Sequence, residues 1–150
     1  FYNISTSEQR HMDTLKKMVQ NYSLLDPVVD DTHGTFTSTV LDTLYQELIL
    51  SVLKGPVDAL FVGALIEEKD IRDIQATLEE CTHSDLIRAY ENLMRGSRNH
   101  LRAFVGQIEN LGLVYEAKIL EQSVVDEIVD SPVERGVQNM VGVGRKGPGR

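Results

Sequence analysis

The sequence predicts an all-α protein, and three observations carry this prediction. Apolar residues recur mostly three or four positions apart, which is the period of a helix, rather than alternating as in a strand. Only four of the 150 residues are prolines, and three of them fall between the periodic segments, where helices should begin or end. Aromatic residues are few, at 6% of the chain. We therefore predict an antiparallel helical bundle with one crossover that contains a short helix.

The first two helices are bounded by prolines. A helix is expected over about residues 5–25, because Pro27 restricts the residue before it and cannot continue the helix. Residues 28–36 are rich in Asp and Gly and should form a loop. A shorter second helix should run over about residues 38–53 and end before Pro56.

The next two helices are longer and should form the centre of the bundle. One is expected over about residues 57–80, and a polar break follows it. In that break, Thr82 or Ser84 is placed to cap the next helix with its hydroxyl group. The fourth helix should then run over about residues 85–111 and close at Gly112.

A short last helix is expected over about residues 120–129, ended by Pro132. Beyond it the chain carries repeated glycines and basic residues, which predict a flexible tail. The domain organisation is therefore one helical bundle over residues 1–132 and a tail over residues 133–150. With 150 residues, the chain has room for one domain with a core and for no second domain.

Charge and hydropathy exclude several classes of protein. The formal net charge of −8 argues against a nucleic-acid partner, because such proteins normally carry a basic surface. No apolar run approaches the roughly 20 residues that span a bilayer, so a membrane partner is not expected either. The single cysteine, Cys81, rules out an intramolecular disulfide.

The first pattern that can carry chemistry is Glu8-x-x-His11. Side chains three residues apart lie on the same face of a helix, so the carboxylate and the imidazole point the same way. A buried ionisable pair needs a partner, which a metal ion would supply. The alternative is a capping box, because Ser5-x-x-Glu8 also fits that pattern. The apolar face that the pair shares continues through Ile4, Leu15, Met18 and Tyr22.

The second pattern is an acidic group in the third predicted helix. Glu67 falls on an apolar stripe, and its alternative is a solvated position at the edge of that stripe. Asp70 is one turn away and is able to reach inward. Glu68 precedes Arg72 by four residues, which predicts an exposed ion pair. The stripe consists of Leu60, Ala64, Glu67, Ile71, Ile74 and Leu78.

The third pattern is His100, at the centre of an apolar seam in the fourth predicted helix. A lone histidine in such a seam is more often a core residue with satisfied hydrogen bonds than a metal ligand. Here three helices each offer an inward-facing Glu or His, and di-metal carboxylate bundles combine such residues from facing helices. The seam consists of Leu86, Tyr90, Leu93, Ser97, His100, Phe104, Ile108 and Leu111.

Four segments, residues 7–13, 62–71, 90–93 and 95–104, closely resemble the ferritin-like family known as domain of unknown function 2202. The resemblance covers about residues 2–132, and the block 95–104 is highly specific. It implies a bundle related to ferritins, bacterioferritins and rubrerythrins. It also implies iron binding between the helices.

The resemblance also implies particular ligands. Glu8 and His11 fall on the second-helix ligand pair of the superfamily, Glu67 on its third-helix Glu, and His100 on its fourth-helix His. Ser97 stands where the superfamily has its fourth-helix Glu, so one bridging carboxylate is absent or replaced. The expected metal ligands are Glu8, His11, Glu67 and His100, with Glu68, Asp70 and Ser97 as secondary candidates.

The family also begins with a helix that carries a Glu-rich ligand motif, and nothing in this sequence corresponds to it. We therefore expect a bundle without its N-terminal helix, either a fragment of a longer protein or a homo-oligomer whose second copy fills the gap. The absence of an initiating Met favours the fragment.

The predicted function is a ferritin-like metal-binding protein that holds one or two iron ions, with manganese or zinc as alternatives, and that oxidises iron or handles peroxide. The alternative is a metal-free bundle that serves as an oligomerisation or interaction module. In that case Glu8 and Glu67 should pair with basic residues such as Arg10, Arg72 or Arg98.

Overall fold

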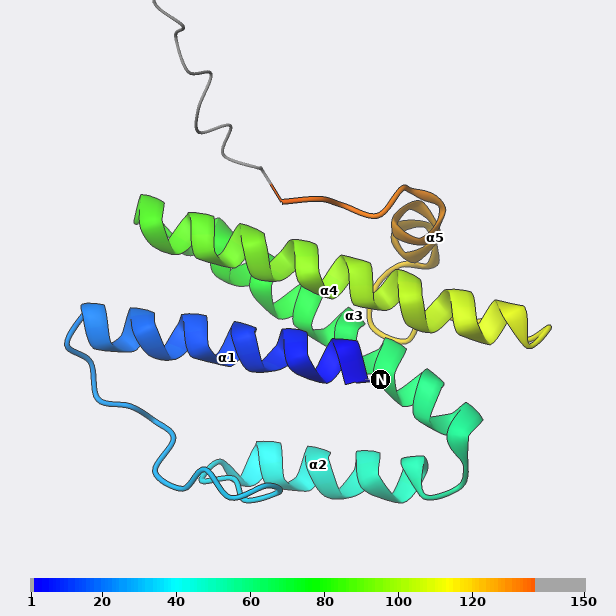
Figure 1. The fold of residues 1–150 in the computed structure, drawn as a ribbon, viewed down its shortest axis with the longest axis horizontal. Helices are drawn as coiled ribbons and strands as arrows, with labels where there is room; N and C mark the ends of the chain where they lie inside the picture. The colour runs from blue at the N-terminus through cyan, green and yellow to red at the C-terminus, as the bar shows by residue number, and fades with distance from the viewer. Residues whose placement is uncertain (1, 137–150) are drawn as a thin grey trace, which may run out of the picture.

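The computed structural model describes residues 2–136, which form α-helices joined by loops, with no strand in that range (Figure 1). The all-α prediction is therefore confirmed. Most of the predicted flexible tail, residues 137–150, lies outside the described residues. The helices are α1 (Tyr2–Asn21), α2 (Thr39–Val52), α3 (Pro56–Glu80), α4 (Ser84–Asn110) and α5 (Gln122–Asp130).

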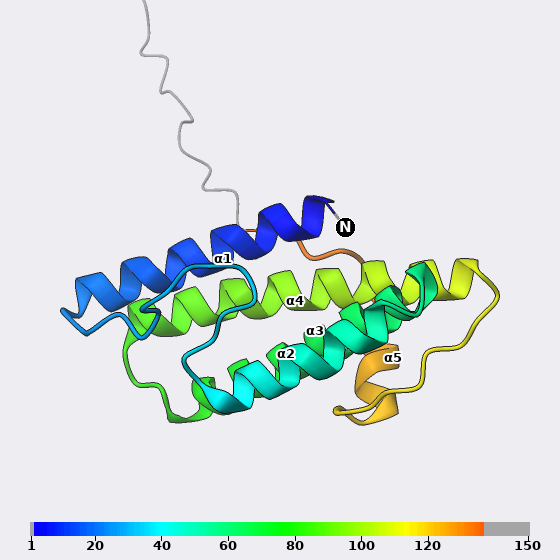
Figure 2. The same ribbon diagram turned by 90° about the horizontal axis from the view of Figure 1, so that it is seen from below.

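The longest helices, α3 and α4, form an antiparallel hairpin that carries the rest of the fold (Figures 1 and 2). α1 packs along α4 and runs antiparallel to it, whereas α2 packs along α3. α5 lies across α4 near its C-terminal half. As a result, α1 and α2 flank the hairpin rather than packing against each other (Figure 2).

Helices α1 and α4 end in the same turn, although a serine occupies its left-handed position in one and a glycine in the other. After α1, Ser23 has a φ of 53° and the Leu24 N–H donates to the Val19 carbonyl group, which closes the helix. After α4, Gly112 has a φ of 75° and the Leu113 N–H donates to the Ile108 carbonyl group in the same way. The sequence signalled the second end by its glycine. The predicted end of the first helix at Leu25 was wrong because a serine occupies the left-handed position.

The helix starts also follow local hydrogen bonding. Ser38 caps α2 by accepting the Leu41 N–H at 3.5 Å, as expected for a helix that begins near residue 38. The predicted capping of α4 by Thr82 or Ser84 was wrong, because Ser84 is already helical and the cap position falls on His83, whose side chain makes no capping bond. α5 begins at Gln122 rather than 120, because the preceding amides bind a buried carboxylate, described below.

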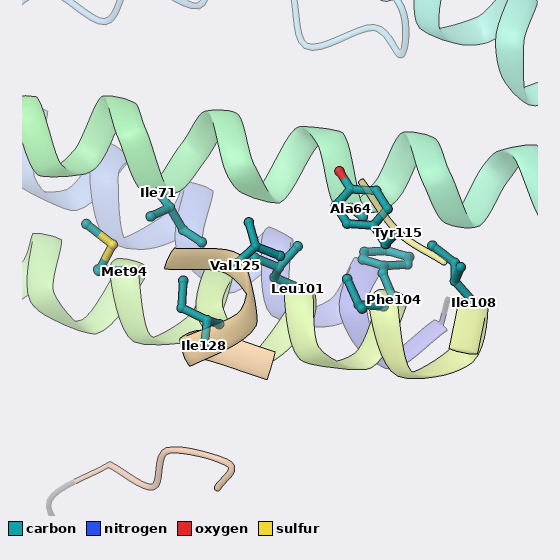
Figure 3. Close-up of a cluster of buried hydrophobic side chains, with 10 residues drawn as sticks. Ala64, Ile71, Met94, Leu101, Phe104, Ile108, Tyr115, Val125 and Ile128 are labelled. Atoms are coloured by element: carbon teal, nitrogen blue, oxygen red, sulfur yellow. The ribbon is translucent and has the colours of Figure 1, made fainter. Parts of the chain in front are cut away.

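The hydrophobic core lies between α3 and α4 and is closed on one side by α5 (Figure 3). Leu101 and Ile108 of α4 have no solvent exposure, and burial of each such side chain contributes about 1.5–3 kcal/mol. Val125 and Ile128 of α5 point toward these residues (Figure 3). The predicted stripes of the third and fourth helices are thus on the core side, except that Leu111 at the end of α4 is 56% exposed.

The α1 and α2 side of the molecule is much less buried. No residue of α2 is buried, and Leu15 on the predicted apolar face of α1 is 39% exposed. Over the residues that the structure describes, no helix combines the length and the hydropathy that a membrane crossing requires. The large apolar side chains exposed on these two helices include Met12, Leu15, Val40, Leu41 and Leu50, and Tyr22 just after α1 is also exposed.

Candidate metal centre

Three ionisable side chains, one each from α1, α3 and α4, lie close together inside the molecule. Glu8, Glu67 and His100 each place a possible ligand atom within 4.8 Å of the other two. His100 Nδ1 lies 2.8 Å from Glu8 Oε1 and 3.3 Å from Glu67 Oε1. Glu67 is only 3% exposed and His100 only 8%. Three of the four principal ligands expected from the sequence therefore lie together.

The helical period explains this convergence. Glu67 occupies the same face of α3 as Ala64 and Ile71, both of which belong to the core. His100 occupies the face of α4 that also carries the buried Ser97 and Phe104. Because α3 and α4 pack along each other and α1 lies against α4, these faces meet where α1 delivers Glu8.

Polar atoms of this cluster are buried without hydrogen bonds. Glu8 Oε1, Glu67 Oε2 and His100 Nδ1 have no partner with hydrogen-bond geometry among the described residues, although their contacts are close. Buried polar atoms are normally paired, and each unpaired one costs about 1–3 kcal/mol. A cation placed among the two carboxylates and the imidazole would satisfy all three atoms.

The electrostatics of the cluster are those of a cation between two anions. Burial alone would raise the pKa of Glu8, but the neighbouring His100 and His11 lower it to about 2. Burial alone would lower the pKa of His100, but Glu67 and Glu8 raise it to about 9. Burial raises the pKa of Glu67 above its ordinary value. At neutral pH a proton on His100 thus supplies the positive charge, and a metal ion bound there would have to displace it.

His11 lies beside this cluster rather than within it. Its Nδ1 is 3.1 Å from Glu8 Oε2, and its ring centroid is 5.8 Å from that of His100. In this arrangement His11 orients the carboxylate of Glu8. The alternative capping-box interpretation of Glu8 does not apply, because α1 begins before Ser5 and Ser5 lies within the helix.

The secondary candidates Ser97 and Asp70 lie close to Glu67. Ser97 is 2% exposed, and its hydroxyl group bonds to Glu67 and opposes the rise of that pKa. Burial, with repulsion from Glu67 and Glu8, raises the pKa of Asp70 to about 6. Asp70 places no ligand atom in the three-residue cluster.

Glu68 corrects one expectation from the sequence. The predicted exposed ion pair with Arg72 was wrong, since Glu68 has no solvent exposure and Arg72 instead contacts Asp73 at 2.9 Å. The Tyr115 hydroxyl group donates to Glu68 Oε1 at 2.5 Å. Three backbone N–H groups, those of Lys118, Ile119 and Leu120, donate to the same carboxylate at 2.7–3.1 Å.

Tyr115 and these amides were not singled out from the sequence. They belong to residues 111–121, which are irregular, so no periodicity marked them. The Glu68 carboxylate is saturated by this loop, so its role is to hold the loop in place against α3.

Two of the basic residues that the metal-free alternative named, Arg98 and Arg72, have other partners. Arg98 donates to Glu134 at 2.5–2.7 Å, and Arg102 donates to the same carboxylate at 3.0 Å. Arg72 binds Asp73. Glu8 contacts His11 and His100, and Glu67 contacts His100.

Comparison with known proteins gives concordant results. The profile of the uncharacterised protein domain DUF2202 matches residues 1–132. The chain is 42% identical over 137 residues to the uncharacterised protein MJ0754 of Methanocaldococcus jannaschii, a match that covers 91% of this chain and 74% of the relative. It is also similar to the crystal structure of hypothetical protein MJ0754 from Methanococcus jannaschii DSM 2661, with a TM-score of 0.86, 41% identity, and coverage of 89% of this chain and 77% of the other. By both sequence and structure, the chain belongs to the DUF2202 family.

Proposed function

We propose that this protein binds one divalent transition-metal ion, with iron as the expected ion, through Glu8, Glu67 and His100. The observation that carries the proposal is the set of three buried polar atoms that lie around one point and that make, among residues 2–136, close contacts within the cluster but no bond of hydrogen-bond geometry. The chemistry of the donors fits, because carboxylate and imidazole ligands together suit iron, manganese and zinc. Iron is preferred among these because of the resemblance to ferritin-like proteins.

A single ion fits the residues better than a pair of ions. Among the described residues, three side chains contribute to the cluster, whereas a two-metal site ordinarily needs more carboxylates, one of which is replaced here by Ser97. Two carboxylates and one imidazole also leave coordination positions of a six-coordinate ion open. Bound iron with open positions would supply oxidation chemistry with oxygen or peroxide. His11 would then keep Glu8 oriented, and Glu67 and His100 would hold the ion in a buried setting.

The test is a titration of the metal-free chain with Fe²⁺ under anaerobic conditions, with Mn²⁺ and Zn²⁺ as comparisons. We expect about one ion per chain, and an affinity that falls by more than about 100-fold in His100→Ala and Glu67→Gln. The matched control is His33→Ala, which removes an exposed histidine from a loop outside the cluster and should bind as wild type does. At about 100 times its Kd, the ion should stabilise the fold by about 2.7 kcal/mol.

Two results would overturn the proposal. One is wild-type protein that binds none of the three ions, and the other is His100→Ala that binds as tightly as wild type. Binding that is lost equally in His33→Ala would also argue against the cluster, because it would place the ion elsewhere on the chain.

Self-association is a second proposed role, and it is compatible with metal binding. The observation that favours it is α2, which has no buried residue although Leu50 and Val40 are 66% and 75% exposed. Exposed apolar side chains that gather on one element are typical of interaction surfaces. Sedimentation of the chain over a range of concentrations tests this role, since a protein that stays monomeric at all of them would rule it out.

A further inference from the structure

His11 lies directly against the backbone of α4 at Gly96. A Cβ atom added to Gly96 would lie 2.5 Å from both Cε1 and Nε2 of His11, but 3.8 Å from its Nδ1. Heavy atoms that are not bonded prefer separations of about 3.5–4.0 Å. Even one methyl group at this position would therefore require the imidazole to move by about 1 Å.

The other nitrogen of the same ring contacts Glu8, a member of the three-residue cluster. His11 Nδ1 lies 3.1 Å from Glu8 Oε2, and Glu8 Oε1 lies 2.8 Å from His100 Nδ1. The imidazole is rigid and planar, so its Nε2 edge contacts α4 while its Nδ1 edge contacts the carboxylate. A shift of the ring away from Gly96 must therefore either move Glu8 or break the bond between His11 and Glu8.

From this geometry we propose that Gly96 is a positioning residue of the metal site. Because Gly96 has no side chain, the His11 ring lies directly against α4. The ring thereby fixes the position of the Glu8 carboxylate beside Glu67 and His100. The inference rests on the proposed metal function. It assigns to Gly96 a role that acts through His11 and involves no contact with the ion.

The same helix provides a matched control. Gly106 also lies in α4, but a Cβ atom there would meet nothing within 4 Å. Gly106→Ala therefore changes a helical glycine without touching the site. Gly63 of α3 differs from both, since its Cβ would meet the ring of Phe104 at 2.5 Å, a packing contact of the core.

The experiment is a double-mutant cycle on the full chain, in which Gly96→Ala is made in wild type and in His11→Ala. Affinity for Fe²⁺ is measured under anaerobic conditions, and the Tm of each metal-free protein is measured alongside. In wild type, Gly96→Ala should lower the affinity about 10–100-fold, the usual effect of losing an interaction that orients a ligand. In His11→Ala the same substitution should cause no further loss, because the obstructing ring is gone. Gly106→Ala should bind within about twofold of wild type.

The inference would be overturned if Gly96→Ala lowered the affinity for Fe²⁺ equally in wild type and in His11→Ala. It would also be overturned if Gly96→Ala bound Fe²⁺ as tightly as wild type does. If Gly96→Ala fails to fold, folding of the Gly96→Ala, His11→Ala double variant supports the inference, and failure of both overturns it. If wild type binds no ion, the proposed function fails, and the metal-free Tm values still test whether Gly96 and His11 are coupled. If His11→Ala alone abolishes binding, the affinities cannot show the coupling, and the Tm values of the metal-free proteins test it instead.

Discussion

Glu67 and Glu68 are neighbours in the sequence, and each is at most 3% exposed, but their surroundings differ completely. Glu68 accepts hydrogen bonds from four groups, the Tyr115 hydroxyl and three backbone N–H groups of residues 118–120. Within residues 2–136, Glu67 Oε2 has no hydrogen-bond partner, and Glu67 Oε1 lies 3.3 Å from His100 Nδ1. Successive residues of a helix project about 100° apart, so one carboxylate faces the loop before α5 and the other faces α1 and α4.

How completely each carboxylate is bonded distinguishes the structural carboxylate, Glu68, from the candidate functional one, Glu67. For Glu68, burial alone would raise the pKa, but the bonds from Tyr115 and the loop amides hold it below its ordinary value. For Glu67, burial prevails and the pKa is raised. A saturated buried carboxylate stabilises the fold, whereas an unsaturated one in a cluster of titratable groups is a candidate for binding or chemistry.

The largest effect that tests this comparison is expected from replacing each carboxylate by its isosteric amide. In metal-free protein, Glu68→Gln should lower the free energy of unfolding by about 3–5 kcal/mol, because its NH₂ group would face donors that need an acceptor. Glu67→Gln should change it by less than about 1 kcal/mol, because the lost contact with His100 is offset by the replacement of an incompletely bonded buried charge with a neutral amide. Urea unfolding of both variants measures the difference.

Metal titration of the same two variants supplies the complementary measurement. Glu68→Gln that remains folded should keep its affinity for the ion, whereas Glu67→Gln should lose it. Similar unfolding free energies for the two variants would contradict the prediction. They would show that the four hydrogen-bond donors around Glu68 do not make this carboxylate more important for stability than Glu67.

A third carboxylate, Glu134, extends the comparison to a partly exposed group. Bonds from Arg98, with Arg102 adding to them, hold its pKa at about 2. Because the folded-state pKa lies below the unfolded one, the stabilisation is present above about pH 4.5 and is lost as the pH falls toward about 2. Glu134→Gln should therefore lower the free energy of unfolding by about 1–2 kcal/mol near neutral pH, and by nearly nothing near pH 2.

The measurement is urea unfolding of wild type and Glu134→Gln across that pH range. The Asn99 side chain donates to the Glu134 carbonyl group, a bond that the substitution leaves in place, so the variant isolates the carboxylate. A difference between the two proteins that persists unchanged to about pH 2 would show that the effect does not come from this titration.

The sequence was informative where a repeating pattern or a glycine marked the structure. The 3.6-residue period placed Glu67 and His100 on core-facing stripes, and both lie in the cluster. The helical period could not predict the hydrogen bonds of Glu68, because its partners come from an irregular loop about 50 residues away in the chain. It also could not reveal the contact of His11 with Gly96, which depends on the distance between α1 and α4.

The smallest predicted effect concerns the ion pair that sequence spacing suggested between Glu68 and Arg72. Arg72 is about half exposed and contacts Asp73, which is equally exposed, so Arg72→Ala should change the free energy of unfolding by less than about 0.5 kcal/mol. Thermal unfolding at low and high salt measures it, with Lys69→Ala as a matched control on the other cation that contacts Asp73. A loss of several kcal/mol in Arg72→Ala alone would mean that Glu68 depends on this guanidinium after all. Its burial would then reflect an ion pair rather than the amides of residues 118–120.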